Sequence, residues 1–286
     1  MKSLGLVFTV LITLAFNSYA QTHDPRVVCN LPNFLTESSG VEVINDNAVW
    51  THNDGGSQAQ LYLLDTNGVV IRTLHFLNSG NNDWEDLCSD ASGNIYVGDF
   101  GNNYNNRQDL KIYKIPDPTT FTNDSIIPEV INFSYPDQTM FPPPSSQQNY
   151  DCEGFFHYGD SLYLFSKNRG TSNFTKMYRI PDDTGTYVAT LVDSFDTSRW
   201  ITAADISPNN SRMVLLSENI IHVFEGFNGS SFFNGQYYPI NITLTQKEAI
   251  GFIDEDRVYM TDELLFTIGR KMYEVDVDAI ISSING

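Results

Sequence analysis

Four glutamates open similar short segments of this 286-residue chain, and their carboxylates are the groups best suited to chemistry. The segments read Glu37-Ser-Ser-Gly40, Trp84-Glu-Asp-Leu87, Asp151-Cys-Glu-Gly154 and Lys247-Glu-Ala-Ile250. Carboxylates that converge cannot all stay ionised and dry without a compensating charge. Ca²⁺ removes this conflict, because it takes about six to eight oxygen ligands from carboxylates and carbonyls. The sequence therefore predicts a Ca²⁺ site formed by Glu37, Glu85, Glu153 and Glu248.

Two other roles for these glutamates remain open. They hydrogen-bond backbone N–H groups of neighbouring repeats and lock the fold, or one of them acts directly in catalysis. A further repeat reads Thr202-Ala-Ala-Asp205 and lacks the glutamate. Coordination of the cation by every repeat is therefore not expected.

A second polar set follows a β-rich run in each repeat, as in Lys167-Asn168-Arg169. Arginine forks suit carboxylate or phosphate groups. Alternatively, Arg107, Lys167 or Arg169 could form a salt bridge with Asp54 or Asp99. Tyr104 stands in an Asn-rich loop and is a candidate for stacking against a ligand. The predicted ligand-binding residues are Asp99, Asn102, Asn103, Tyr104, Arg107, Lys167, Asn168, Arg169 and Asp262.

Catalytic signatures are otherwise sparse. The sequence has no G-x-S-x-G elbow, H-E-x-x-H motif or phosphate loop. The catalytic candidates are His52, Asp54, Arg107 and Arg169. Four other aromatic residues are expected in the core rather than on a sugar-binding surface: Trp50, Trp84, Tyr96 and Tyr163.

An internal repeat of β-rich runs must position these residues. Short runs such as Asn94-Ile-Tyr-Val-Gly98 are followed by a third strand, such as Leu110–Ile115, and by a more variable fourth strand. Among the expected fourth strands are Glu129–Phe133 and Tyr187–Leu191. Four antiparallel strands repeated radially form a β-propeller, whose first strands line a central channel. The four glutamates should therefore ring one mouth of that channel.

The repeat count predicts an all-β, five-bladed propeller. The last repeat runs out near Asp278 after three strands, so Arg26–Asn30 is expected to complete the last blade and close the ring. Closure in this way removes an exposed sheet edge. A six-bladed ring is the alternative, and it would need a blade within residues 116–150, which we interpret as one strand and a long loop.

The N-terminus predicts export. Lys2 precedes the apolar run Leu4–Phe16, and Ser18-Tyr19-Ala20 resembles a cleavage site, so residues 1–20 are predicted to be a signal peptide. The apolar run is too short to span a membrane. Residues 21–286 would then form a single propeller domain, secreted or periplasmic, and monomeric.

Charge and cysteine content set further limits. The net charge is −19, and loss of Lys2 makes it −20, a field that repels nucleic acid and anionic membranes. The partner is expected to be a small molecule, a glycan or a protein. Cys29, Cys88 and Cys152 allow at most one disulfide, and whether Cys88 or Cys152 pairs is left open.

Several motifs resemble those of a known group of proteins. Glu-Ser-Ser-Gly at 37–40, Trp-Thr-His-Asn-Asp-Gly-Gly at 50–56, Asp-Trp-Glu-Asp-Leu at 83–87 and Tyr-Val-Gly-Asp-Phe-Gly-Asn-Asn at 96–103 resemble exported propellers of Bacteroidetes. These are related to the SdiA-regulated and SMP-30/NHL-like groups. The resemblance implies a propeller with a calcium site on its axis and, in distant relatives, lactonase or phosphoesterase activity.

Two functions follow as expectations. The first is a binding module that holds Ca²⁺ and an extracellular ligand or partner on the channel face. The second is a metal-dependent hydrolase of a phosphoester or lactone, in which the cation polarises the substrate or activates water. The sequence does not decide whether the protein is an enzyme.

Overall fold

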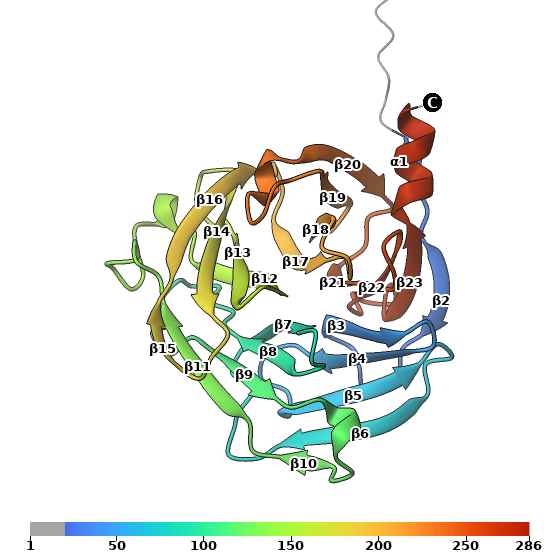
Figure 1. Cartoon of the computed structure of the whole chain (residues 1–286), viewed down its shortest axis with the longest axis horizontal. Coiled ribbons are helices and arrows are strands. Elements are labelled where there is room, and N and C mark those ends of the chain that lie inside the picture. Colours follow the sequence, from blue (N-terminus) through green and yellow to red (C-terminus); the bar gives the residue numbers. More distant parts are fainter. Residues whose placement is uncertain (1–20, 286) are drawn as a thin grey trace, which may run out of the picture.

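Residues 21–285 are described by the computed structural model, and they form five β-sheets arranged as blades around a central axis (Figure 1). The predicted signal peptide, residues 1–20, lies outside the described residues. The chain is a five-bladed β-propeller, as the sequence repeat predicted.

In each blade, four antiparallel strands run from the axis to the rim. Blade 1 contains β3 (Ser38–Asn45), β4 (Ala48–Asn53), β5 (Gln60–Asp65) and β6 (Val70–Phe76). Blade 2 contains β7 (Trp84–Ser89), β8 (Ile95–Asp99), β9 (Lys111–Ile115) and β11 (Glu129–Ser134). Blade 3 contains β12 (Asp151–Tyr158), β13 (Ser161–Lys167), β14 (Phe174–Pro181) and β16 (Thr190–Asp196). Blade 4 contains β17 (Ile201–Ile206), β18 (Arg212–Ser217), β19 (Ile220–Glu225) and β20 (Gln236–Ile242).

Blade 5 is built from both ends of the chain. Its inner strands are β21 (Lys247–Phe252), β22 (Arg257–Asp262) and β23 (Lys271–Asp276), and its outer strand is β2 (Arg26–Asn30). β2 pairs antiparallel with β23, from Arg26 opposite Glu274 to Asn30 opposite Lys271. The predicted closure of the ring by the N-terminal strand is confirmed, and the six-bladed alternative is wrong.

Three short parallel strands link neighbouring blades at the rim, and the sequence repeat did not predict them. β10 (Ser125–Ile126) joins β6, β15 (Gly185–Val188) joins β11, and β1 (Thr22–His23) joins β20. Each lies just before the outer strand of one blade and pairs with the previous blade. The strand expected at residues 187–191 is therefore two strands, divided at Ala189, whose N–H donates to Ser134 O across the blade boundary.

The hydrophobic core is divided into five clusters of buried residues, one between each pair of neighbouring blades. The cluster between blades 4 and 5 also receives Val277 and Ile281 from α1 (Val277–Asn285), a helix that the sequence reading omitted. Three 3₁₀ turns complete the secondary structure: η1 (Pro118–Thr120), η2 (Ser145–Gln147) and η3 (Phe232–Asn234). None of the helices within residues 21–285 is long and apolar enough to cross a membrane.

Candidate functional site

Every innermost strand carries a β-bulge at the same point near its start. A bulge adds one residue that has no partner on the neighbouring strand, and it redirects that residue's side chain. The five bulged residues are Ser39, Glu85, Glu153, Thr202 and Glu248. Each blade therefore offers one side chain at the same end of the axis.

Four of the five bulged residues line a cavity of about 350 Å³ at this end of the axis. The exception is Thr202, whose hydroxyl donates to Lys247 O at 2.8 Å. The cavity is lined by Ser39, Asp54, Glu85, Asn103, Glu153, Lys167, Arg169, Trp200, Glu218, Gln246, Glu248 and Glu263. It is an acidic cavity, and we refer to it below as the central cavity.

The structure brings three of the four predicted glutamates into the central cavity. Glu37 does not line it: this side chain is exposed and lies two residues before the bulge at Ser39. In the same way Asp83 and Asp151 lie two residues before Glu85 and Glu153. Glu37 is thus the counterpart of these aspartates, and the predicted repeat was displaced by two residues in blade 1.

Two groups of carboxylates near the central cavity have ligand oxygens within 4.8 Å of one another. One is Asp54, Asp83 and Glu85, and the other is Glu85, Asp151 and Glu153. Burial and the neighbouring carboxylates raise the pKa of Glu85 well above its usual range, and they raise that of Asp83 to about 6. The aspartates at positions 83 and 151 were missed by sequence reasoning, although both precede a predicted glutamate in an Asp-x-Glu pattern.

Cations neutralise only one of these two groups. Lys167 Nζ lies 2.9 Å from Glu153 Oε2, and Arg169 Nε lies 2.6 Å from Asp151 Oδ2. No ion pair within residues 21–285 reaches Asp54, Asp83 or Glu85. The carboxylates of blades 1 and 2 therefore lack the positive charge that those of blade 3 possess.

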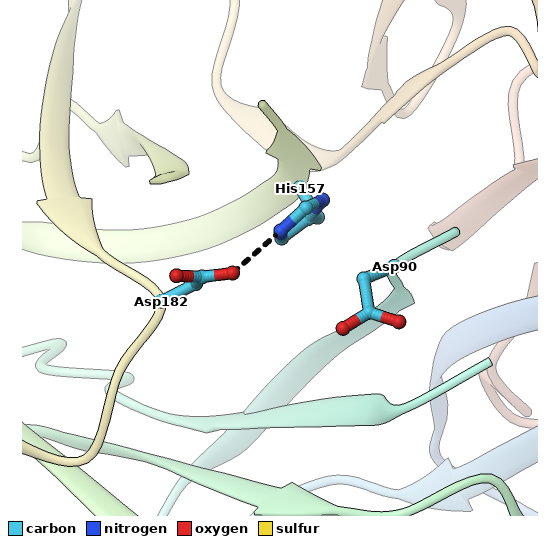
Figure 2. A group of neighbouring side chains, drawn as sticks. All are labelled: Asp90, His157 and Asp182. Atoms are coloured by element: carbon cyan, nitrogen blue, oxygen red, sulfur yellow. Dashed lines mark hydrogen bonds and ion pairs between the residues drawn. The ribbon is translucent and has the colours of Figure 1, made fainter. Parts of the chain in front are cut away.

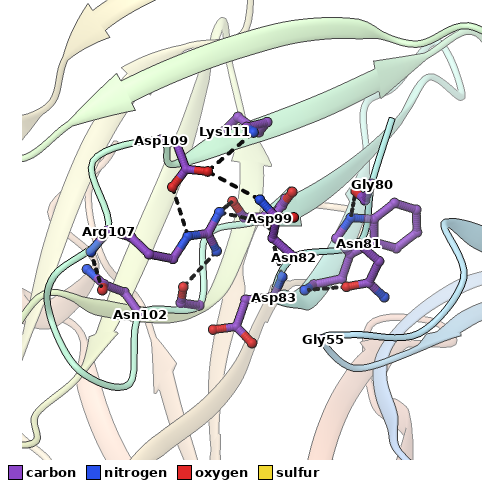
Figure 3. Close-up of polar contacts among 12 residues, drawn as sticks. Gly55, Gly80, Asn81, Asn82, Asp83, Asp99, Asn102, Arg107, Asp109 and Lys111 are labelled. Atoms are coloured by element: carbon purple, nitrogen blue, oxygen red, sulfur yellow. Dashed lines mark hydrogen bonds and ion pairs between the residues drawn. The ribbon is translucent and has the colours of Figure 1, made fainter. Parts of the chain in front are cut away.

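Arg107 holds the loop that supports the unpaired group (Figure 3). Its guanidinium contacts Asp99 Oδ1 at 2.9 Å, Asp109 Oδ1 at 3.1 Å and Gly101 O at 2.8 Å. Asp99 Oδ1 also accepts the N–H of Asp83 at 3.1 Å. Gly101 packs against Glu85: a Cβ atom added at position 101 would overlap Oε1 of Glu85. Arg107 and Asp99 thus form the ion pair considered as an alternative above and act as positioning residues outside the cavity.

Several of the other predicted ligand-binding residues, among them Asn102, Tyr104 and Asp262, do not line the central cavity. Asn102 donates its N–H to Asp151 Oδ1 at 2.6 Å, and Asp262 accepts the Tyr273 hydroxyl at 2.6 Å. Tyr104 is 78% exposed but does not line the central cavity. Asn168 lines a small neighbouring hollow, and Asn103 lines the central cavity itself.

Three of the catalytic candidates, His52, Asp54 and Arg169, lie in two different environments. His52 is fully buried, packs edge-on against Trp84, and has its pKa lowered to about 4 by burial. Asp54 lines the central cavity, as does Arg169. The four aromatic residues expected in the core, Trp50, Trp84, Tyr96 and Tyr163, are all buried.

Asp86 is a buried carboxylate that links three of the innermost strands. It follows the bulge of blade 2, at the position that glycine or alanine occupies in the other blades. Its carboxylate accepts N–H groups from Leu87 at 2.8 Å, Phe155 at 3.1 Å and Ala204 at 3.3 Å. One side chain thus joins the inner strands of blades 2, 3 and 4.

The opposite end of the axis opens into a second cavity of about 590 Å³, whose lining includes Glu42, His157 and Asp205. His157 Nε2 lies 2.9 Å from Asp182 Oδ2, and Asp90 lies nearby (Figure 2). Asp90 already accepts hydrogen bonds from the backbone N–H groups of Ser92 and Asn94 and from the Asn94 amide. We assign Asp90 to closure of this turn rather than to metal binding.

Comparisons with known proteins support the fold. No protein-family model matches the chain, and no curated protein matches it. Among solved structures, it is similar to a PQQ-bound aldose sugar dehydrogenase from Streptomyces coelicolor, with a TM-score of 0.50, 8% identity, and coverage of 87% of this chain and 96% of that one. At this identity the likeness concerns the β-propeller fold alone.

Two gluconolactonase structures are also similar, with TM-scores of 0.47. One, from Xanthomonas campestris, shares 13% identity and is aligned over 83% of this chain and 71% of its own. The other, a putative gluconolactonase, shares 10% identity over 84% of this chain and 73% of its own.

Proposed function

We propose that this chain is an exported β-propeller that binds Ca²⁺ in the central cavity and uses the same face to bind an extracellular ligand. The observation that carries the proposal is the group formed by Asp54, Asp83 and Glu85. Its oxygens lie within 4.8 Å of one another, and no ion pair among residues 21–285 neutralises them. Hard oxygen donors of this kind suit Ca²⁺.

The ligand would approach from the opposite wall of the cavity. Lys167 and Arg169 line that wall beside Asn103, and they supply donors for a carboxylate, phosphate or hydroxyl group. These donors are already oriented by Glu153 and Asp151, so binding would require little reorganisation.

A metal-dependent hydrolase of a phosphoester or lactone is the second candidate, favoured by the position of these cations beside the carboxylate group. Bound Ca²⁺ would supply Lewis-acid polarisation of the substrate. Arg169 would stabilise developing negative charge. Arg107 is not assigned this role, because Asp99, Asp109 and Gly101 occupy its guanidinium.

Calcium titration of the Glu85→Gln variant tests the proposal. We expect Ca²⁺ affinity measured by calorimetry to fall at least about tenfold, equivalent to about 1.4 kcal/mol. Glu37→Gln is the matched control, because Glu37 is exposed on the same face but outside the cavity. Wild-type protein that binds no Ca²⁺, or equal affinities for the two variants, would overturn the proposal.

A test with substrates distinguishes the binding module from the hydrolase. A hydrolase should turn over members of a panel of phosphoesters and lactones, and chelation with EDTA should abolish that turnover. A binding module should show Ca²⁺ affinity without turnover.

A further inference from the structure

Trp200 occupies a position that is polar in every other blade. Two residues before each bulge stand Glu37, Asp83, Asp151, Trp200 and Gln246. Blade 4 therefore presents an indole, with the hydroxyl residue Thr202 at the bulge, where other blades present acids or an amide. This change alters what the rim of the central cavity can bind.

The indole of Trp200 is also unusually accessible. It is 50% exposed, whereas Trp50 and Trp84 are 2% and 0% exposed. A half-exposed indole leaves apolar surface in contact with water, and covering that surface is favourable. An aromatic surface held open beside polar groups is characteristic of a binding site.

Three hollows meet at Trp200. One is the central cavity, and a second of about 240 Å³ is lined by Ser198, Arg199, Trp200, Ser217 and Glu218. A third of about 130 Å³ separates Trp200 from the loop that includes Asn168 and Asn173. Trp200 lines all three, so this residue stands at the border between the central cavity and the two smaller hollows.

Hydrogen bonds within the loop hold the backbone that carries Trp200. Asp196 Oδ1 accepts the N–H of Ser198 at 2.9 Å, and the Thr197 hydroxyl donates to Arg199 O at 2.7 Å. On the side of the central cavity, the Arg169 guanidinium carbon lies 5.0 Å from the centroid of the Trp200 ring. A rigid aromatic anchor lowers the entropic cost of binding.

The lining of the 240 Å³ hollow indicates the class of ligand. The indole offers a flat apolar face, and the residues around it are polar: Ser198, Ser217, Glu218 and Arg199. A pyranose ring has the complementary form, with C–H groups on its face and hydroxyls at its edge. The opposite charges of Arg199 and Glu218 balance, which favours a neutral sugar over a charged one, and the net charge of −19 opposes nucleic acid.

We propose that Trp200 is the stacking platform of a saccharide subsite, and that a neutral oligosaccharide extends from it toward the central cavity. The inference deepens the proposed function by naming the class of ligand. It does not depend on Ca²⁺ for the contact with Trp200 itself.

The test is calorimetric titration with neutral trisaccharides of glucose, galactose, mannose, xylose and N-acetylglucosamine, in the presence of Ca²⁺. Binding should also protect tryptophan fluorescence from acrylamide, because Trp200 is the exposed indole of the described chain. We expect at least one trisaccharide to bind, Trp200→Ala to weaken that binding at least about tenfold, and Trp200→Phe to restore part of it.

Controls separate this subsite from the calcium site. Tyr104→Ala, which removes an exposed aromatic ring outside the central cavity, should keep wild-type saccharide affinity. Binding of no trisaccharide, or equal saccharide affinity of Trp200→Ala and wild type, would overturn the subsite and leave the calcium proposal standing. Saccharide binding without Ca²⁺ binding would overturn the calcium proposal alone.

Discussion

Lys167 and Glu153 form a 2.9 Å ion pair on the wall of the central cavity, with side chains only 10% and 3% exposed. The pair gives the cavity two unlike sides. The blade 3 side is balanced by its own cations, whereas Asp54, Asp83 and Glu85 on the other side have no ion-pair partner within residues 21–285. This asymmetry is why we place the cation on the side of blades 1 and 2.

In the absence of Ca²⁺, Lys167→Met should lower the free energy of unfolding by about 3 kcal/mol. The substitution removes the ammonium group that pairs with the buried carboxylate of Glu153. Denaturant unfolding measures this change. Lys176→Met is the control, since Lys176 pairs with the more exposed Asp137 and should cost about 1 kcal/mol or less. Adding Glu153→Gln to Lys167→Met should recover part of the loss. An unchanged unfolding free energy for Lys167→Met would contradict the assignment.

Asp86→Ala should be among the most destabilising substitutions near the axis. It removes the acceptor of the Phe155 and Ala204 N–H groups, and an unsatisfied buried donor costs about 1–3 kcal/mol. We expect a loss of about 3 kcal/mol in denaturant unfolding. Asp124→Ala, which breaks a surface pair with Arg72, should cost about 1 kcal/mol or less. Similar losses for the two variants would argue against Asp86 as the link between blades.

Stability should fall as the pH rises from about 5 to 8. Burial and the nearby Asp205 carboxylate raise the pKa of Glu42 to about 8, so folded Glu42 keeps a proton that unfolded Glu42 has lost. The stabilisation is complete near pH 4.5 and disappears as the pH passes about 8. Asp205, whose pKa is raised to about 7 chiefly by burial, contributes in the same direction.

Glu42→Gln should flatten this pH dependence, because glutamine still accepts the Ser89 hydroxyl but cannot ionise. We expect the Tm at pH 8 to rise by about 2–4 °C, the shift that about 1 kcal/mol produces in a domain of this size. The Tm at pH 5 should stay unchanged. The exposed Glu255 supplies the control variant Glu255→Gln, and a matching shift there would refute the explanation.

The cysteines should be unreactive in the folded protein. All three are free, which answers the question of whether Cys88 or Cys152 pairs, and burial raises the pKa of both thiols well above the usual range. Burial also raises the pKa of the half-buried Cys29 to about 11. Iodoacetamide at pH 8 followed by mass spectrometry should label Cys29 slowly and leave the other two intact. In concentrated guanidinium chloride all three should react; rapid labelling of native Cys88 would contradict this.

The fold could be predicted from the sequence because the second strand of several repeats has the same alternation of side chains and a tyrosine at the equivalent position, as at Tyr96, Tyr163 and Tyr259. Strands of two residues, such as β1 and β10, have no alternation that could reveal them. Their parallel pairing is decided by contact with the neighbouring blade, which no local pattern encodes.

The site was harder to predict because a bulge inserts one residue without changing the residue pattern around it. Aligning Glu37 with Glu85 matched residue types, but the bulges align Ser39 with Glu85 instead. Trp200 was missed for another reason: the blade 4 repeat was read from Thr202 onward, and Trp200 lies two residues earlier, at the position of Asp83 and Asp151. Which residues are equivalent between blades is determined by strand pairing, and residue types alone do not reveal it.

The pairing of β2 with β23 sets an order on folding. β2 is synthesised before any blade strand except the short β1, yet its partner β23 ends only at Asp276. Contacts so distant in sequence carry a large loop-closure entropy and form slowly. Blades 1 to 4 can assemble as they are synthesised, whereas β2 cannot pair until β23 has been synthesised. β2 is therefore expected to be among the last strands of the propeller to reach its final place.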